Sequence, residues 1–359
     1  MMPRKRRLPP EGPRSARCTT LPAADGRNAL KAAVIGTGGA ARLHAHSYGS
    51  CPHTQPVAVV SGSAERAANF ATDFGVRGYT SVEEMLQRER PDILSVATLE
   101  WDHVEPVLLA LEAGCHVLCE KPMAHTIAAG EAMVAAAKRS GRMLGVNYNY
   151  RSVPAHALIK EELACGGFGR PALFSAHMHA YLWPHLLDLA RYFFGDPTQV
   201  SATLVDEQEL RPPVSVASQR PWAYGGQLHD EMLYHPSIAV AATMRFGTEE
   251  EANFVASMSA SAMVPLEEHF WSFALYGTQE SIVISRATRA NLRGSASGGR
   301  IAEKIAALPA CSYQDSFALS VSGFVEAVRD GKPSPVTGED GLAAMRLDAA
   351  IVRAAKSAH

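Results

Sequence analysis

Short apolar runs alternate with amphipathic stretches from about residue 30 to residue 148. Uninterrupted runs of four to seven residues are typical of buried parallel strands. The stretches between them have helical spacing, and two of them stop at Gly75 and Gly141, as helices often do. The predicted strands are Lys31–Ile35, Val57–Ser61, Ile93–Ala97, His116–Cys119 and Met143–Asn147. This order predicts a doubly wound parallel sheet, a Rossmann domain, over residues 30–148.

The pattern changes after Asn149. One helix, Pro154–Ala164, is followed by strand-like segments with few helices between them. The predicted strands are Ala172–Ala180, Val200–Asp206, Ala239–Phe246, Asn253–Ser259, Trp271–Gly277 and Ser281–Ser285. We therefore expect residues 149–359 to form an α+β domain with an open, mostly antiparallel sheet. Asn291–Arg300 is predicted to be a loop, and helices are expected around Phe317–Asp330 and Leu342–Lys356.

The first 29 residues differ from the rest. They are basic and rich in proline, and a disordered tail is expected there. Arg6 and Arg7 are not followed by an apolar segment, so an export signal is not predicted. The six cysteines of the 359 residues include no C-x-x-C pair, which is typical of a reduced, cytoplasmic protein.

Bulk composition excludes several classes of protein. The chain is 47% hydrophobic and 19% charged, which is enough for real cores in two domains. Its net charge of −2 implies no nucleic-acid partner. No apolar run approaches the length of a membrane span, so no membrane partner is expected.

The first predicted strand runs directly into a glycine-rich turn, Gly36-Thr37-Gly38-Gly39-Ala40-Ala41. The segment fits G-x-G-x-x-[G/A], in which Gly36 permits the tight turn and Gly38 the close approach of a diphosphate. Ala41 is small enough for the following helix to pack on the strand. Because strand, turn and helix occur in this order, the segment predicts a dinucleotide site at a helix N-terminus.

The end of the second predicted strand indicates which dinucleotide. NAD-binding domains usually have an acidic residue there, which binds the ribose 2′-hydroxyl. Here the chain reads Ser61-Gly62-Ser63-Ala64-Glu65-Arg66. Ser61 and Ser63 offer hydroxyl groups, and the guanidinium of Arg66 could pair with a 2′-phosphate. NADP is therefore predicted, with NAD as the second choice.

Together these segments resemble the Gfo/Idh/MocA oxidoreductases, a family that includes glucose–fructose oxidoreductase and inositol dehydrogenases. The similar segments are the glycine turn, Ala113–Pro122 with its Glu120-Lys121-Pro122 motif, Asn149-Tyr150-Arg151, His185–Arg191 and Phe324–Pro333. The resemblance runs from about Lys31 to Lys356. It implies hydride transfer between nicotinamide and a hydroxyl or ketone carbon of a sugar, cyclitol or related polyol.

The resemblance also implies the site residues. Lys121 matches the lysine that contacts the reacting oxygen, and His185 matches a histidine that exchanges the proton or orients the substrate. Asp188, one turn further on, is interpreted as structural. Cofactor contacts are expected from Gly36, Gly38, Gly39, Ala40, Ala41, Ser61, Gly62, Ser63, Arg66, Ala97, Thr98, Glu120, Lys121, Pro122, Asn149 and Arg151. Substrate contacts are expected from Lys121, His179, Tyr181, Trp183 and His185.

The chain departs from the family pattern near the histidine. Many members have an aspartate four residues before it and a glycine two before, where this chain has Tyr181 and Trp183. Tyr181 could donate a proton in place of the aspartate, or it could form an aromatic wall. Thr98-Leu99-Glu100 also replaces the family's Thr-Pro-Asn, which leaves the nicotinamide contacts less defined.

Other interpretations stay open at this stage. His177, His179 and His185 could suggest zinc, but histidines lining a pocket or sheet are the simpler interpretation, and no metal is predicted. The main alternative to an enzyme is an inactive cofactor-binding regulator on the same fold. A reductase of a C=N or enone bond is a further variant. We also expect a homodimer or homotetramer built through the sheet of the second domain.

Overall fold

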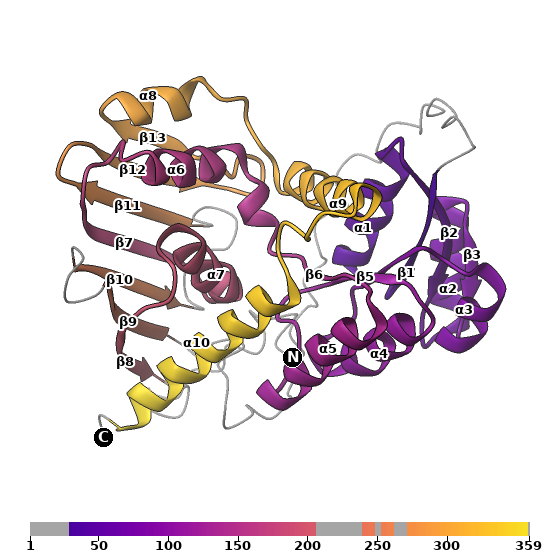
Figure 1. Cartoon of the computed structure of the whole chain (residues 1–359). Coiled ribbons are helices and arrows are strands. Elements are labelled where there is room, and N and C mark those ends of the chain that lie inside the picture. The colour runs from indigo at the N-terminus through magenta and orange to yellow at the C-terminus, as the bar shows by residue number, and fades with distance from the viewer. Residues whose placement is uncertain (1–28, 206–238, 248–252, 262–270, 358–359) are drawn as a thin grey trace, which may run out of the picture.

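The computed structural model describes residues 29–205, 239–247, 253–261 and 271–357, which form two lobes (Figure 1). The first lobe contains a six-stranded parallel sheet with the order β3-β2-β1-β4-β5-β6, which confirms the predicted Rossmann domain. Its strands are β1 (Leu30–Ile35), β2 (Thr54–Val60), β3 (Arg77–Tyr79), β4 (Ile93–Val96), β5 (His116–Cys119) and β6 (Leu144–Val146). Its helices are α1 (Gly39–Ser50), α2 (Ala64–Phe74), α3 (Val82–Glu89), α4 (Val104–Glu112) and α5 (Ile127–Ser140).

Local capping fixes where these helices begin and end. The side chains of Ser63, Ser81 and Thr126 accept hydrogen bonds from backbone N–H groups in the first turns of α2, α3 and α5. Gly75 and Gly141 adopt the left-handed conformation directly after α2 and α5. These caps agree with the stops predicted from the sequence.

The second lobe is built around a seven-stranded sheet with the order β13-β12-β11-β7-β10-β9-β8. Its strands are β7 (Pro171–His179), β8 (Gln199–Val205), β9 (Ala239–Phe246), β10 (Phe254–Ser261), β11 (Trp271–Gly277), β12 (Ser281–Ala287) and β13 (Ser295–Gly298). Only the β7–β10 pair is parallel, so the sheet is mostly antiparallel as predicted. The predicted loop Asn291–Arg300 was wrong in part: residues 295–298 pair with β12 as an edge strand, since neighbour pairing overrides the weak β propensity of Ser and Gly.

One face of this sheet is covered. Alternate strand residues point into a core with α6 (Pro154–Ala164), α7 (Trp183–Phe194) and α8 (Arg300–Ala307). Residues on the other face are mostly small or polar. Its larger apolar residues include Leu173 and Tyr276, which are exposed and directly opposite each other on β7 and β11, and Val255, which pairs with Leu173 from β10. The sheet thus has one buried and one open face.

The last two helices return to the first lobe. Helix α9 (Tyr313–Asp330) packs beside α1, where Phe324 and Val325 share a core with Val34 of β1. Helix α10 (Gly338–Ser357) extends across both lobes (Figure 1). Its Met345 belongs to the Rossmann core and its Ile351 to the core of the second lobe. The C-terminal segment therefore joins the lobes that border the site.

Three further expectations concern the basic tail, a membrane span and the cysteines. The basic tail falls almost wholly in residues 1–28, outside the described part of the chain. Within the described ranges, no helix is both long and apolar enough to cross a membrane. The described cysteines are all free thiols.

Candidate active site

A cleft of about 820 Å³ lies at the carboxyl ends of the Rossmann strands. Ligands of doubly wound sheets bind at this edge. Most predicted cofactor residues line the cleft: Gly36, Gly38, Gly39, Ala40, Ser61, Gly62, Arg66, Ala97, Thr98, Glu120, Lys121 and Pro122. Tyr181 lines it from the second lobe. Outside this lining are four of the predicted cofactor residues, Ala41, Ser63, Asn149 and Arg151, and three of the predicted substrate residues, His179, Trp183 and His185.

The glycine turn has the properties of a diphosphate site. Gly36 has a φ of +109°, and a Cβ there would overlap the carbonyl oxygen of Ala97. Gly38 is the N-cap of α1, which has no side-chain cap and no acidic residue in its first turn. A Cβ on Gly38 or Gly39 would meet nothing within 4 Å, so the backbone faces open space. The free N–H groups of the helix thus point toward the cleft, and the turn fits a dinucleotide.

Not all of the motif touches the cleft. Ala41 is fully buried in the core between α1 and the sheet, which is the packing role predicted from its size. Ser63 caps α2 by accepting a hydrogen bond from the backbone N–H of Arg66. Ala41 thus acts through packing and Ser63 through the cap of α2.

Among the described residues that line the cleft, none beside Ser61 at the adenosine end is acidic. The hydroxyl of Ser61 lies 3.5 Å from that of Thr37 and accepts a hydrogen bond from the backbone N–H of Ser63. Arg66 lines the cleft, and its guanidinium makes no ion pair with any described residue. Arg42, by contrast, is paired with Asp73 at 2.6 Å. Of these two arginines, Arg66 is therefore the one whose guanidinium could bind an anionic group at this end of the cleft.

Lys121 lies at the other end, buried to 8% exposure and held by Tyr181. Its Nζ donates a hydrogen bond to the backbone carbonyl of Tyr181 at 3.3 Å, and the centre of the Tyr181 ring is 4.0 Å from the same nitrogen. The ammonium thus faces the ring rather than the hydroxyl group, which is a cation–π arrangement.

Glu120, next in sequence, carries a buried carboxyl group. His44 Nε2 lies 2.9 Å from Oε1, and the amide of Asn147 donates to the same oxygen at 2.6 Å. Burial opposes ionisation of Glu120, but these hydrogen bonds and the nearby charge of Lys121 lower its pKa below the usual value. The carboxylate is therefore ionised on the wall of the cleft.

His185 lies in the first turn of α7 and is 1% exposed. Its ring stacks on Tyr150, with centroids 4.3 Å apart, and neither ring nitrogen has a hydrogen-bond partner among the described residues. Burial, together with the charge of Lys121, places the pKa of His185 well below its ordinary value. The imidazole is consequently neutral and has a free donor and a free acceptor.

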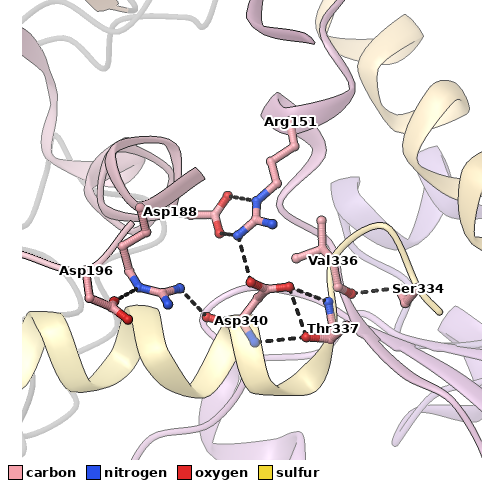
Figure 2. Close-up of polar contacts among 8 residues, drawn as sticks. Arg151, Asp188, Asp196, Ser334, Val336, Thr337 and Asp340 are labelled. Atoms are coloured by element: carbon pink, nitrogen blue, oxygen red, sulfur yellow. Dashed lines mark hydrogen bonds and ion pairs between the residues drawn. The ribbon is translucent and has the colours of Figure 1, made fainter. Parts of the chain in front are cut away.

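Arg151 does not line the cleft, and Figure 2 shows it between Asp188 and Asp340. Its guanidinium binds Asp188 bidentately, at 2.9 and 2.6 Å, and Asp340 at 3.3 Å. Burial raises the pKa of Asp188 to about 6 against the opposing effect of Arg151, so the carboxylate is still ionised at neutral pH. Asp340 also caps α10 through Thr337. This ion pair connects the start of the second lobe, α7 and α10.

Three further predicted residues have protein partners. Asn149 donates its amide to the hydroxyl of Ser316 at 2.6 Å. The indole of fully buried Trp183 donates to Asp348 at 2.9 Å. Nδ1 of His179 accepts a hydrogen bond from the backbone N–H of Tyr181 at 3.0 Å. All three lie outside the lining of the cleft. The bonds of His179 and Trp183 support the segment that carries Tyr181 and His185, and the bond of Asn149 leads to α9.

No group of three metal-ligating side chains occurs in the described part of the chain. His177 instead lies on the open face of the sheet, 2.8 Å from the hydroxyl of Ser259. His44 of α1 is fully buried, in contact with Glu120.

Sequence reasoning missed several residues of the site. Asp102 lines the cleft from the short helix η1 (Glu100–Asp102), and Thr80 lines it after β3. Asn147 and Ser95 were also missed. Asn147 bonds directly to Glu120, and Ser95 contacts His44, which in turn contacts Glu120. Each lies at or near the carboxyl end of a strand, and that position is the signal that could have found them.

Comparison with known proteins agrees with this geometry. Residues 30–148 match the model of an oxidoreductase family with an NAD-binding Rossmann fold, and residues 178–359 match the C-terminal alpha/beta domain of the same family. The site is thus that of a Rossmann-fold oxidoreductase. The chain belongs to the Gfo/Idh/MocA oxidoreductase family.

Individual relatives are sugar-converting enzymes by name. The chain is 30% identical to a 1,5-anhydro-D-fructose reductase of Ensifer adhaerens, with 83% of this chain and 88% of the relative covered. It is 26% identical to a levoglucosan dehydrogenase of Pseudarthrobacter phenanthrenivorans, with 91% and 96% covered. An oxidoreductase structure from Agrobacterium radiobacter in complex with NAD⁺ has the same fold, with a TM-score of 0.74, 18% identity, and 92% and 97% covered.

Proposed function

We propose that this protein is an NADP(H)-dependent oxidoreductase that interconverts a hydroxyl and a ketone carbon of a sugar, cyclitol or related polyol. The observation that carries the proposal is Lys121 on the wall of the cofactor cleft, close enough to His185 for its charge to lower the pKa of that histidine, whose two ring nitrogens have no partner among the described residues. Relatives named for sugar substrates support the substrate class. The dinucleotide, when bound, supplies the hydride acceptor or donor.

Each of the two residues has one task. The Lys121 ammonium holds the oxygen of the reacting carbon and stabilises negative charge that develops on it. His185 accepts the hydroxyl proton as that oxygen becomes a carbonyl, and returns it in the reverse direction. A histidine with a strongly lowered pKa is unprotonated at neutral pH, so it is ready to accept this proton.

Tyr181 acts as an aromatic wall. Its ring and its backbone carbonyl both contact the lysine amine, so they orient it before substrate arrives. His179 and Trp183 act indirectly, since their hydrogen bonds fix the turn η3 (Ala180–Leu182) and the start of α7. Of the two roles considered for Tyr181, we therefore favour the aromatic wall over proton donation.

The preference for NADP rests on Ser61 and Arg66. A 2′-phosphate at this end would meet a hydroxyl and a guanidinium without an opposing carboxylate. With NAD, the same guanidinium would have no anionic partner.

A substrate screen tests the function. Purified protein is assayed with NADP⁺ and NAD⁺ against sugars, cyclitols and glycosides, and with NADPH against the matching ketones, with Lys121→Met as the matched control. We expect turnover of at least one polyol, faster with NADP than with NAD, and abolished in the control. Absence of turnover in both directions across the panel, with folded protein, would contradict the proposal.

We further propose a homo-oligomer formed through the open face of the second sheet. The exposed pair Leu173 and Tyr276, with Val255 beside Leu173 on β10, places an apolar patch on that face. Light scattering should report a dimer or tetramer at micromolar concentration. Leu173→Lys should shift it toward monomer, whereas a wild-type monomer would refute this proposal.

A further inference from the structure

Glu120 places a fixed negative charge on the wall of the cleft. The side chain is 7% exposed, and two donors converge on its Oε1, from His44 and Asn147. Oε2 accepts no hydrogen bond from any described residue, and it is not sealed from solvent. The second oxygen therefore faces the cleft, which Glu120 lines.

Both donors are oriented by residues behind them. Ser95 Oγ lies 3.0 Å from His44 Nδ1 and 2.7 Å from the hydroxyl of Tyr48. If Tyr48 donates to Ser95 and Ser95 to Nδ1, His44 keeps the proton on Nε2 for Glu120. Ser320 donates to the amide oxygen of Asn147 at 2.7 Å, which turns the amide nitrogen toward Glu120. With His44 in this tautomer every donor of the network has an acceptor, so the network holds the carboxylate in place at the wall of the cleft.

The order of the strands places Glu120 on the nicotinamide side. The glycine turn after β1 takes the diphosphate, and Ser61 after β2 marks the adenosine side. Strands β4 and β5 lie on the opposite side of β1, so the other half of the dinucleotide extends toward Thr98 and Glu120. Oxidised nicotinamide is cationic, and Lys121 already places an ammonium there. Two neighbouring cations in a buried site repel each other.

We propose that Glu120 is the fixed countercharge that allows the site to hold the oxidised nicotinamide beside the Lys121 ammonium. Its chemical partner is the cationic ring of the oxidised cofactor, so it biases binding toward the oxidised form over the reduced form. The inference rests on the proposed function, because it requires a dinucleotide in this cleft. His44 and Asn147 are positioning residues that keep the carboxylate at the wall.

Direct binding measurements test this without turnover. Dissociation constants for NADP⁺ and NADPH are measured by calorimetry and nucleotide fluorescence for the wild type and Glu120→Gln. Glutamine keeps an oxygen for both donors and removes only the charge. We expect the ratio of the NADP⁺ to the NADPH constant to rise on the order of tenfold, since unit charges several ångströms apart interact by a few kcal/mol at an intermediate dielectric. The NADPH constant should change little.

Three further variants sharpen the result. Lys121→Met removes the positive charge, so the ratio should fall. Glu105→Gln removes an exposed carboxylate of α4 that lies outside the lining of the cleft, and it should leave the ratio unchanged because solvent screens that charge. His44→Leu removes one hydrogen-bond donor and keeps the glutamate. The ratio of the NADP⁺ to the NADPH constant should therefore rise as in Glu120→Gln, but by less. This last variant also provides the test if Glu120→Gln does not fold.

The outcomes separate the two proposals. An unchanged ratio in Glu120→Gln, or an equal loss of affinity for both forms, would overturn the countercharge while leaving the proposed function intact. If the wild type prefers NAD to NADP, the NADP assignment fails, and the ratio is measured with NAD⁺ and NADH. If the wild type binds no dinucleotide, both proposals are overturned.

Discussion

The two halves of the site use their polar groups differently. In the Rossmann half, buried polar side chains satisfy one another, as Glu120, His44 and Asn147 do. In the half formed by the second lobe, both nitrogens of His185, the indole nitrogen of Trp271 and the amide oxygen of Asn149 are buried without a partner among the described residues. Such an atom typically costs about 1–3 kcal/mol.

This contrast indicates how each half binds its ligand. The Rossmann half presents a backbone turn and a fixed carboxylate whose geometry is complete within the protein. The other half leaves donors and acceptors unused, and His185 is the one among them whose pKa is lowered by the charge of Lys121. A hydroxyl group of a sugar or cyclitol bound at Lys121 is the partner that we propose for this histidine.

The largest expected effect comes from removing the lysine that lies where the halves meet. Lys121→Ala should lower kcat by about 10²–10⁴-fold, because the amine that stabilises the reacting oxygen is lost. The affinity for NADP should change far less, since the diphosphate and adenosine contacts lie at the glycine turn and Arg66. Steady-state kinetics and fluorescence titration measure the two quantities.

Two variants serve as controls for that result. His185→Ala should also lower kcat and spare NADP affinity. Tyr181→Phe keeps the ring and the carbonyl that hold the lysine amine, so kcat should stay close to that of the wild type. A large loss in Tyr181→Phe would restore the proton-relay role for this residue, and normal turnover in Lys121→Ala would end the assignment.

The next effect concerns stability at the junction between the lobes. Arg151→Met leaves Asp188, 0% exposed, without its bidentate partner, and loss of one member of a buried pair costs about 3–5 kcal/mol. Urea unfolding measures the change. Arg346→Met is the matched control, because its pair with Glu131 is more than half exposed on both sides and should contribute about 1 kcal/mol or less. Similar losses of unfolding free energy in both variants would show that the buried Arg151 pair contributes no more to stability than an exposed pair.

A smaller effect is expected at the adenosine end. Arg66→Ala should weaken NADP binding by about 1.5–3 kcal/mol, the range of hydrogen bonds to charged groups, and leave NAD binding nearly unchanged. Arg42→Ala provides the control, since that guanidinium is engaged by Asp73. If Arg66→Ala weakens both cofactors equally, the guanidinium does not bind a 2′-phosphate.

The same contrast explains what could be predicted from the sequence. The glycine turn, Ser61 and Glu120-Lys121-Pro122 follow strands directly, so local pattern places them at one edge of a sheet, and most of them line the cleft. Arg151 was expected at the cofactor, but it lies in an ion pair with Asp188 and Asp340, which are 37 and 189 residues away. Only the packing of α7 and α10 brings those carboxylates together.

Other parts of the prediction failed for the same reason. Asn291–Arg300 has the composition of a loop, yet residues 295–298 pair with β12 because the sheet offers them an edge. His44 follows the glycine turn by a few residues, but its role depends on Glu120, 76 residues later. Local signals thus describe the Rossmann half well, and long-range packing decides the rest.

The smallest expected effect is on the pH dependence of stability in the second lobe. His156, in the second lobe, is fully buried against Trp271, and burial lowers its pKa to about 4. The unfolded chain would protonate this histidine near pH 6.5. Between these two values the unfolded state binds a proton that the native state does not, so the histidine destabilises the fold as the pH falls.

Comparison with His156→Phe isolates this contribution. The unfolding free energy of the wild type should fall relative to that of the variant as the pH is lowered from 6 to 4.5. The expected slope is up to about 1.4 kcal/mol per pH unit, and urea titrations at each pH would measure it. All other titrating groups are shared by the two proteins and cancel to first order. A difference that is constant with pH would mean that His156 accepts its proton in the native fold, and that this part of the second lobe is less closed to water than the Rossmann half.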